Sequence, residues 1–554
     1  MTLDRPGADE LLFLPLGGSG EIGMNLTLYG HAGKWLMIDL GITFADGSAP
    51  GVDVILPDPA FIAERRADLA GIVLTHAHED HIGAVPYLWP QLRCPLYATP
   101  FTAGLLRRKL AEAGLEGEAP LVEVPMSGRF RVGPFDVELV TITHSIPEPN
   151  CIVVRTPLGA VLHTGDWKID PEPLVGEVTD EAALRRIGQD GVLAMVCDST
   201  NALLDGWSRS EGAVRESLTE LIGRFRKRVA VTCFASNVAR LETIARAAMA
   251  HGRHTVLVGR SLWRIDQVAR ENGYLADLPA FLGEGDAGYL PEDKVLLLCT
   301  GCQGEPGSAL AKIARGEHPQ VALGPGDAVI FSSRVIPGNE RAVGAVQNDL
   351  VRLGVEVVTE AEHFVHASGH PRRDELAAMY SWVRPRIAVP VHGELRHLRS
   401  HARFAESCQV PQAVVVENGA VLRLAPGPAA IIGEVPSGRL AVDGTSLVPL
   451  DGAALRSRRR IMFNGAAVAT LVLDRAGRLQ ADPQVTLQGL IDPENGDDMI
   501  DDIREAVRGA LATLSHAQRL DDAQVKEAAR LALRRAFFAR RGKKPVTDIH
   551  LVRI

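Results

Sequence analysis

The sequence predicts a multidomain α/β protein, and three observations support this fold class. The chain has 554 residues, which is too long for a single hydrophobic core and suggests roughly three or four structural units. Apolar runs alternate with helical stretches between about residues 206 and 375, as in a parallel sheet covered by helices. Earlier strand-like runs end in residue types that bind metals, and the chain after about residue 456 mixes strands with helices.

Composition and charge are those of an ordinary globular chain, with 46% hydrophobic and 23% charged residues. No apolar run approaches the roughly 18 residues that span a bilayer, and the acidic start does not resemble a secretory signal. We therefore expect a cytoplasmic protein without a membrane partner. The net charge of −9 argues against coating nucleic acid through bulk charge, but it leaves room for a basic channel.

The seven cysteines are odd in number and scattered, so they do not form a disulfide framework. Cys299 and Cys302 make one CxxC motif, which has two functional interpretations: a redox pair or half of a zinc site. The motif has no second pair and follows the apolar run 295–298. We interpret these cysteines as a core residue and a loop residue.

Residues 75–81 read Thr-His-Ala-His-Glu-Asp-His and directly follow a short apolar run. Imidazole and carboxylate together suit zinc and neighbouring transition metals. The alternate spacing of His76 and His78 places both imidazoles on one side of an extended segment, and Asp80 and His81 follow as the chain turns. A surface histidine patch is the plain alternative, but this density of ligands behind a strand favours a site for two ions.

The glycines of residues 18–23 superficially match a dinucleotide fingerprint, with Asp39 about twenty residues further on. A Rossmann unit requires a helix after these glycines, whereas residues 25–29 and 34–39 form two extended runs around a turn. We therefore exclude a nucleotide site here. Asp39 instead has the character of a carboxylate that fixes the orientation of a metal-binding imidazole.

Further strand-like runs end at His144, Asp166 and Asp198. Taken singly, His144 would more often be a core histidine and Asp166 a turn residue. Their repeated position just past a strand, where sheets carry site residues on loops, favours a functional role.

The segment from about residue 206 to residue 375 predicts a parallel sheet with helices on both faces. Its expected strands are 229–234, 255–258, 295–299, 328–331 and 355–358, and its expected helices are 236–249, 308–314 and 339–353. Small polar loops follow several strands, and in such loops backbone N–H groups commonly bind anions. These loops are Ser236-Asn237, residues 301–304 and Ser332-Ser333-Arg334.

Two more motifs mark the end of this segment and the chain just after it. Residues 363–370 read His-Phe-Val-His-Ala-Ser-Gly-His, and after a helix at 374–383 another apolar strand leads into His392. His392 thus resembles His144 and Asp166 in its position. His397 and His401 lie on the following Arg-rich helix, where we expect both to be solvated.

The remaining chain divides into a stretch rich in Pro and Gly at 426–455, which we interpret as a linker with room for short strands at 429–432 and 440–442, and a small α+β domain. The expected strands of that domain are 466–473, 484–491 and 548–554, and its helices are 500–514 and 521–538. It carries no ligand cluster, so we expect it to serve assembly or substrate docking.

The candidate ligands form two groups. His76, His78 and His144 suit one ion, Asp80, His81 and His392 suit the other, and Asp166 is able to bridge them. Two ions roughly 3.5 to 4 Å apart stabilise both the attacking and the leaving oxygen of a hydrolysis.

Together these motifs resemble the metallo-β-lactamase superfamily, which has HxHxDH followed by a downstream His, Asp and His. The inserted α/β segment, Asp198 in Asp-Ser-Thr, and the HASGH and PVHGE stretches resemble its β-CASP nucleic-acid branch. Further agreement lies in LGGSGEIGMN, FASN, GCQGEPGSAL, IPGNE and the C-terminal GKKP. These motifs resemble the bacterial ribonuclease J family over essentially the whole chain.

The resemblance implies a metallo-β-lactamase αββα sandwich formed by residues 1–205 and 376–425. It also implies an inserted parallel-sheet β-CASP domain at 206–375, a linker at 426–455 and a C-terminal α+β domain at 456–554. The insertion would cover the site and form a channel for single-stranded RNA.

The function implied by the resemblance is that of a ribonuclease with two zinc ions per subunit, or manganese in their place. It would cut single-stranded RNA internally and degrade it from a 5′-monophosphate end toward the 3′ end, in rRNA processing, RNA maturation and mRNA decay. A metal-activated hydroxide would attack the phosphodiester. The resemblance further implies a homodimer or homotetramer and partners in an RNA-degradation complex.

The resemblance also implies roles for single residues. Asp198, His370 and His392 stand at the β-CASP motif positions: His392 would bind metal, and His370 would contact the scissile phosphate or act as general acid. Asp80 and Asp198 would be catalytic together with His370. The family's phosphate-binding stretches correspond here to Ser236, Asn237, Ser332, Ser333, Arg334, His366, Ser368, Gly369 and His370. Cys302 stands where the resemblance predicts a serine.

Two alternatives fit the same motifs. A β-CASP DNA nuclease or a eukaryotic-type pre-mRNA endonuclease would share every metal ligand. A non-catalytic RNA-binding subunit arises when such proteins lose ligands, whereas every predicted ligand is present in this chain.

Overall fold

The computed structural model describes residues 5–45, 47, 49–492 and 497–554. In this part of the chain two compact units are distinguished. The first unit contains the described residues of 1–44 and 54–440, and the second contains those of 45–53 and 441–554. Every residue predicted above to bind metal or substrate belongs to the first unit.

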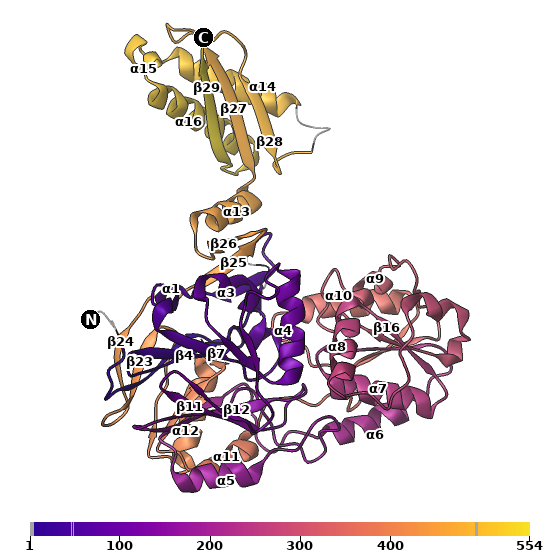
Figure 1. Cartoon of the computed structure of the whole chain (residues 1–554). Coiled ribbons are helices and arrows are strands. Elements are labelled where there is room, and N and C mark those ends of the chain that lie inside the picture. The colour runs from indigo at the N-terminus through magenta and orange to yellow at the C-terminus, as the bar shows by residue number, and fades with distance from the viewer. Residues whose placement is uncertain (1–4, 46, 48, 493–496) are drawn as a thin grey trace. The chain divides into compact units, whose positions relative to one another are not determined.

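A pair of sheets packed face to face forms the larger part of the first unit (Figure 1). One sheet has the order β24 (Ala430–Glu434), β23 (Ala420–Ala425), β1 (Leu11–Gly17), β3 (Leu26–His31), β4 (Lys34–Ile38), β7 (Leu69–Val73), β8 (Leu96–Ala98), β9 (Leu121–Glu123). The other has the order β10 (Arg129–Val132), β11 (Phe135–Thr141), β12 (Asn150–Thr156), β13 (Gly159–His163), β14 (Ala194–Asp198), β20 (Ile387–Val391), β22 (Gln412–Ala413).

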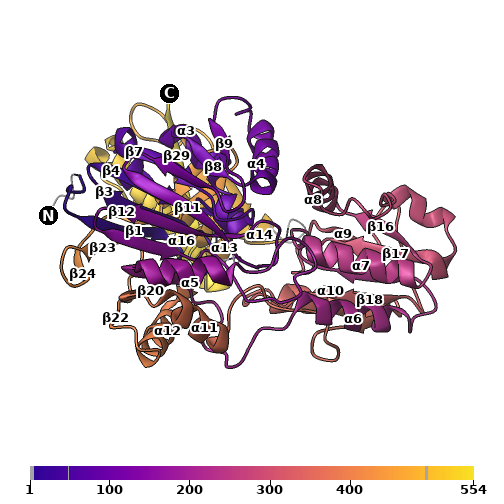
Figure 2. The same cartoon turned by 60° about the horizontal axis from the view of Figure 1, so that its bottom comes forward.

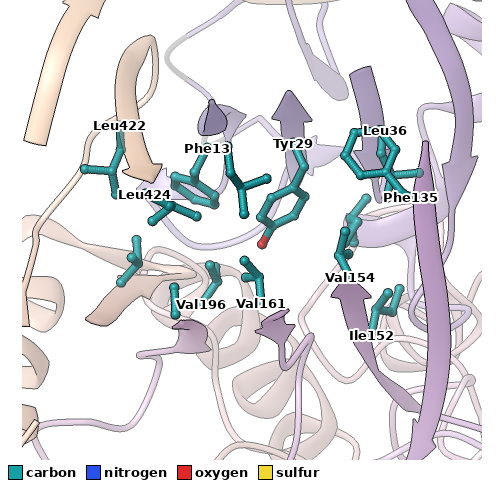
Figure 3. Packing of buried hydrophobic residues seen from close by; sticks show 14 of the residues in the cluster. Phe13, Tyr29, Leu36, Phe135, Ile152, Val154, Val161, Val196, Leu422 and Leu424 are labelled. Carbon is teal, nitrogen blue, oxygen red and sulfur yellow. The ribbon is translucent and has the colours of Figure 1, made fainter. Parts of the chain in front are cut away.

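The core between these sheets forms because alternate residues of each strand point to the same face. Figure 3 shows Phe13, Tyr29 and Leu36 of one sheet above Val154 and Val196 of the other. All of these side chains are fully buried. Burial stabilises the fold by about 1.5–3 kcal/mol for each large apolar side chain.

Helices cover the outer faces, which completes the αββα arrangement that the resemblance implied. Helices α5 (Glu181–Asp190), α11 (Arg373–Val383) and α12 (Leu395–Ser407) pack Leu184, Met379 and Ala405 into a second core beneath β12, β13 and β14. Helices α1 (Ala60–Ala63), α3 (Val85–Leu92) and α4 (Pro100–Glu112) lie beside the other sheet.

The insertion forms the parallel sheet that the sequence predicts (Figure 2). The strand order is β16 (His254–Val258), β17 (Val295–Cys299), β15 (Val229–Thr232), β18 (Ala328–Phe331), β19 (Glu356–Val358). Its helices are α6 (Glu211–Ile222), α7 (Val238–Ala250), α8 (Arg260–Glu271), α9 (Ala309–Ala314) and α10 (Glu340–Arg352). The polar loops at Ser236 and Ser332 follow the carboxyl ends of β15 and β18, which are neighbours in the sheet.

Parallel pairing also explains where the predicted ligands meet. Strands β13, β14 and β20 are parallel neighbours, so their carboxyl ends lie at one edge of the sheet. Asp198 is the last residue of β14, Asp166 follows β13 and His392 follows β20. Residues far apart in sequence are therefore adjacent in space.

The glycine-rich stretch near the start of the chain does not form a nucleotide-binding unit. Strands β3 and β4 pair as an antiparallel hairpin, with Thr27 opposite Ile38, and the described residues 24–40 contain no helix. The predicted pair of extended runs is confirmed.

The cysteine prediction also holds, since all seven cysteines in the described chain are free thiols and Cys299 and Cys302 are both buried.

The second unit contains a smaller α+β fold. Strands β28 (Gln484–Gln488), β27 (Ala466–Leu473) and β29 (Val546–Arg553) form its sheet, against which α14 (Asp497–Ala512) and α16 (Asp522–Arg541) pack. Helices α13 (Ala453–Asn464) and α15 (His516–Leu520) complete it.

The stretch 426–455 contains β24, β25 (Arg439–Asp443) and β26 (Ser446–Pro449), so part of the expected linker is folded. Within the described residues, no helix has the length and apolar character needed to cross a membrane.

The expectation that His397 and His401 are solvated is wrong. Both side chains are buried, because α12 turns this face toward the sandwich rather than toward solvent. The ring of His401 lies between two hydroxyls, with Nδ1 2.9 Å from Ser199 Oγ and Nε2 2.8 Å from Tyr380 Oη. Both ring nitrogens of a neutral imidazole are thus satisfied within the core.

We predict that His401 makes the fold sensitive to acid. Burial lowers the pKa of His401 from 6.5 to about 4. Between pH 6.5 and about pH 4, His401 is therefore protonated in the unfolded chain but neutral in the folded chain. The free energy of unfolding falls by up to ~3 kcal/mol as the pH drops through this window. In unfolding midpoints measured against pH with a metal chelator present, His401→Gln flattens this decline. The exposed His254→Gln serves as control, and equal slopes for both variants would contradict the prediction.

Candidate active site

The histidine motif begins in the loop after β7 and continues into the short helix α2 (Glu79–Ile82). Backbone bonds hold α2 to the segment after the glycine-rich stretch. The N–H of Asn25 donates to the Asp80 carbonyl at 2.9 Å, and the N–H of Leu40 donates to the His81 carbonyl at 2.7 Å. A Cβ at Gly41 would lie 1.7 Å from the Asp80 carbonyl oxygen, so only glycine permits this approach.

Asp39 lies directly behind the motif. One carboxylate oxygen accepts from the Thr75 N–H at 2.8 Å, and the other accepts from the Thr75 hydroxyl at 2.8 Å. The second oxygen also lies 2.7 Å from His81 Nδ1. This contact places a proton of His81 on Nδ1 and directs Nε2 toward the site, where it lies 3.2 Å from Asp166 Oδ2.

One candidate ligand group consists of three imidazoles. His78 Nδ1 lies 3.0 Å from His76 Nε2 and 3.1 Å from His144 Nε2. His144 Nδ1 donates to the Gly369 carbonyl at 2.6 Å, so its Nε2 is available for metal. Burial, reinforced by the nearby charge of His81, lowers the pKa of His76, and burial lowers the pKa of His78 to about 4. Neutral imidazole is the form that binds metal.

A second group contains two carboxylates and two imidazoles. His81 Nε2 lies 3.2 Å from Asp166 Oδ2 and 3.6 Å from Asp80 Oδ2. His392 Nε2 lies 3.3 Å from Asp80 Oδ2. Asp166 Oδ2 is also 3.9 Å from His144 Nε2, so this carboxylate lies between the two groups.

His370 and Asp198 form a pair at the edge of these groups. His370 Nδ1 lies 2.7 Å from Asp198 Oδ2, and the other Asp198 oxygen accepts from the hydroxyl and the N–H of Thr200 at 2.7 and 2.8 Å. This arrangement leaves His370 Nε2 unengaged by Asp198. A further set of donors within 4.8 Å of one another comprises Asp166, Asp198, His370 and His392.

The pKa values of the site carboxyls are set by burial, which raises them, and by nearby imidazole charges, which lower them. Burial by itself raises the pKa of the Asp166 carboxyl, but the charges of His392 and His81 outweigh it and hold that pKa well below its usual range. Burial likewise opposes ionisation of Asp198, and His370 lowers the pKa of Asp198 instead. The carboxylates are therefore ionised and ready to bind cations.

The residues fit divalent cations on two observations. Asp166 Oδ1 is buried, lies 3.2 Å from His392 Nδ1 and forms no hydrogen bond among the described residues, and a buried oxygen without a hydrogen bond is costly. The ring nitrogens of three imidazoles also converge, with His78 Nδ1 3.0 Å from His76 Nε2 and 3.1 Å from His144 Nε2. Three imidazoles in one group and mixed carboxylate and imidazole in the other are donor sets that zinc and manganese accept.

The glycine-rich stretch supports His392 rather than a nucleotide. Strands β2 (Ser19–Gly20) and β21 (Gly393–Glu394) pair in parallel, and the His392 N–H donates to the Gly18 carbonyl at 2.6 Å. His392 itself has a left-handed backbone with φ of +52°. The backbone pairing stabilises this strained conformation and aims the imidazole at the site.

The predicted substrate-binding residues divide into two kinds. Asn237 and Ser332 are buried and engaged inside the protein: Asn237 accepts from the Arg240 N–H at 2.9 Å, and Ser332 donates to the Val365 carbonyl at 2.7 Å. Ser333 is buried as well, and Gly369 contributes its carbonyl to His144.

The other kind retains free polar atoms. His366 Nδ1 is buried without a hydrogen-bond partner in the described part of the chain. The Arg334 side chain is exposed and forms no hydrogen bond with any residue that the structure describes. Ser368 Oγ accepts from Asn201 at 2.8 Å and keeps its own proton to donate, and Ser236 is half-buried.

The sequence analysis did not identify three residues that hold site residues in position. Thr75 connects Asp39 to the motif, Thr200 fixes Asp198, and Asn201 donates to both Ser368 Oγ and the His370 carbonyl. Thr75 directly precedes His76 and Thr200 lies two residues after Asp198, and short polar residues at such places were the available signal. No comparable signal marks Asn201.

Comparisons with known protein families agree with this geometry. Residues 20–234 match the metallo-beta-lactamase superfamily, and residues 354–410 match the Zn-dependent metallo-hydrolase RNA specificity domain. Residues 226–350 match the ribonuclease J beta-CASP domain, and residues 453–554 match the ribonuclease J C-terminal domain.

Similar curated proteins cover most of the chain. Ribonuclease J of Sinorhizobium meliloti is 48% identical over 556 residues, which covers 100% of this chain and 99% of that protein. Ribonuclease J of Mycolicibacterium smegmatis is 44% identical over 84% of each chain. A crystal structure of a protein of unknown function from Enterococcus faecalis shares the fold, with a TM-score of 0.52 and 14% identity over 75% of this chain and 100% of that one.

The αββα sandwich and its clustered His and Asp ligands define a divalent-metal-dependent hydrolase of the metallo-β-lactamase superfamily. The β-CASP insertion narrows this class to enzymes that act on nucleic acid, and the RNA specificity domain indicates RNA. The chain belongs to the ribonuclease J family and is a ribonuclease.

We predict that Asp39→Asn weakens metal binding by about 10–100-fold while the fold is retained, because the carboxylate that orients His81 is lost. Competition with a chromogenic chelator measures the affinity. Asp68→Asn is the matched control, since Asp68 is also buried but pairs with Arg5 and Lys34 outside the site. Equal metal affinity in wild type and Asp39→Asn would refute the assigned role.

Proposed function

We propose that this protein is a two-zinc ribonuclease that degrades single-stranded RNA from a 5′-monophosphate end toward the 3′ end and also cuts it internally. The observation that carries the proposal is the convergence of the two ligand groups beside the His370–Asp198 pair. We assign His76, His78 and His144 to one zinc and Asp80, His81 and His392 to the other, with Asp166 between them.

Bound divalent cations at these groups would lower the pKa of water and neutralise charge on the phosphate. The chain's own residues orient the ligands for this role. Asp39 holds His81, the Gly369 carbonyl holds His144, and Gly18 holds the backbone of His392. The site is thereby preorganised, because little rearrangement of the ligands is required on binding.

His370 is suited to donate the proton that the departing 3′ oxygen needs. Asp198 accepts from Nδ1, which leaves Nε2 to carry a proton toward the substrate. Thr200 fixes Asp198 in turn, so the imidazole is held in one orientation. A positioned imidazole of this kind contributes typically 10²–10⁴-fold to a reaction rate.

Phosphate recognition is assigned to the loops at the carboxyl ends of β15 and β18 and to residues 366–370. The exposed Arg334 and the Ser368 hydroxyl supply donors for phosphate oxygens. A terminal 5′-monophosphate carries more charge than an internal diester, so a donor-lined pocket favours it.

We further propose the division into sandwich (1–205 and 376–425), β-CASP insertion (206–375), linker (426–455) and C-terminal domain (456–554). The family match at 226–350 lies within the proposed insertion, and the match at 453–554 begins close to the proposed C-terminal domain. We also retain three predictions: action in RNA maturation and mRNA decay, assembly as a homodimer or homotetramer, and partners in an RNA-degradation complex. A measurement of mass in solution checks the oligomeric state.

The proposed activity is tested with one labelled RNA that carries a 5′-monophosphate, a 5′-triphosphate or a 5′-hydroxyl, and with the matched DNA. We expect mononucleotides from the 5′-monophosphate RNA, internal fragments from all three RNAs, and about two zinc ions per chain by metal analysis of the same sample. A clear preference for DNA would favour a β-CASP DNA nuclease instead, and mononucleotides released equally from all 5′ ends would refute the end preference.

We predict that His76→Ala with Asp80→Ala lowers cleavage by on the order of a thousandfold or more, because one ligand is removed from each group. RNA binding persists, since the phosphate-binding loops lie on other elements. Gel-shift affinity and cleavage rate are measured on the same preparation. His254→Gln, on the exposed start of β16, serves as control. Wild-type cleavage by the double variant would place the active site elsewhere.

A further inference from the structure

Arg240 in α7 is the feature of the insertion that the proposed mechanism does not use. Its side chain is fully buried, although charged residues are almost never fully buried unless they are paired. Each of the three guanidinium nitrogens donates, toward Glu211 on one side and toward Ser332 and Val365 on the other.

On one side the guanidinium forms a two-pronged ion pair. Nε donates to Glu211 Oε2 at 3.2 Å, and Nη2 lies 3.0 Å from both carboxylate oxygens. Glu211 begins α6, which packs against α7 (Figure 2). The Glu211 N–H donates to Asp170 at 2.9 Å, and Asp170 pairs with the buried Lys168 at 2.6 Å. Arg240 is thereby connected to the sandwich close to Asp166.

On the other side Nη1 joins two of the proposed phosphate-binding stretches. It donates to the Ser332 carbonyl at 2.9 Å, to Ser332 Oγ at 2.6 Å and to the Val365 carbonyl at 3.0 Å. Ser332 opens the loop that carries Arg334, and Val365 directly precedes residues 366–370. The Arg240 N–H also donates to Asn237 Oδ1, which fixes the loop after β15.

We propose that Arg240 is the positioning residue of the phosphate-binding face. One buried cation sets the spacing between the loops after β15 and β18 and the stretch that carries His370, without contacting RNA itself. This role accounts for the burial of Asn237 and Ser332, whose side chains form hydrogen bonds that stabilise the loops and do not contact the substrate. The inference rests on the proposed preference for a 5′-monophosphate, because that preference is what the loop spacing would determine.

The geometry requires arginine rather than any cation. A planar guanidinium presents donors in fixed directions and satisfies a carboxylate and several carbonyls at once, whereas a lysine ammonium is a compact point charge. Arg240→Lys would keep the charge but lose part of the contacts to Ser332 and Val365.

The test asks whether Arg240 positions the phosphate-binding loops or only neutralises the charge of Glu211. Arg240→Met leaves Glu211 buried and unpaired, so we expect a lower unfolding temperature. The double variant Arg240→Met with Glu211→Gln removes both charges and regains much of the lost stability. We expect that this double variant still loses on the order of 10–100-fold in the ratio of kcat/KM for 5′-monophosphate over 5′-hydroxyl RNA, through KM more than kcat, with metal content unchanged.

A matched control is available in the same insertion. Arg253 is also buried and donates to the carbonyls of Phe225, Lys227 and Val295, away from the phosphate-binding loops. Arg253→Met should lower the unfolding temperature and leave the substrate ratio intact.

Three outcomes are distinguished. Recovery of both stability and the wild-type ratio in the double variant would show that Arg240 only neutralises Glu211, and the proposal would fall. If the wild-type enzyme itself does not discriminate between the two RNA ends, the proposed function fails instead. The inference then still requires a raised KM for both RNAs in the folded double variant, and an unchanged KM overturns it.

Discussion

The structure depends on keeping several ionisable groups in a place from which water is largely excluded. Asp39, His76, His81, Asp166 and Asp198 are nearly or fully buried at the edge of the sandwich. A buried charge is tolerated only if it is paired and hydrogen-bonded, so each carboxylate faces an imidazole, and most imidazoles have their second nitrogen engaged. Asp166 Oδ1 is the exception in forming no hydrogen bond among the described residues, and it lies 3.2 Å from His392 Nδ1 within the ligand group.

The rest of the fold holds this cluster in place. The apolar core between the two sheets makes the edge rigid, and the parallel strands β13, β14 and β20 bring Asp166, Asp198 and His392 to one side of it. Glycines and backbone pairing then fix the two remaining segments, α2 and the loop at His392. In the insertion Arg240 has a comparable effect on the phosphate-binding loops, since a buried ion pair has few alternative arrangements.

Much of the fold was predictable because its signals are local. Alternation of apolar runs and helices predicted the parallel sheet at 229–358, and the two extended runs predicted after Gly23 form the hairpin of β3 and β4. The error at His401 has a physical reason: an Arg-rich helix looks solvated in sequence, but which of its faces is buried depends on the sheet beneath it. Asn237 and Ser332 show the same limit, since only their contacts reveal that the side chains point into the protein.

By itself the sequence determined the ligand types, their spacing in HxHxDH and their recurrence after strands, because the chemistry of imidazole and carboxylate does not depend on the fold. Only the tertiary structure decided which nitrogen of each histidine faces the site, that Asp166 lies between both groups, and that Gly18 supports His392. It also decided that Arg240 joins Glu211 to Ser332 and Val365. These are contacts between residues far apart in the chain, and their geometry is set by packing, which no local pattern of residues encodes.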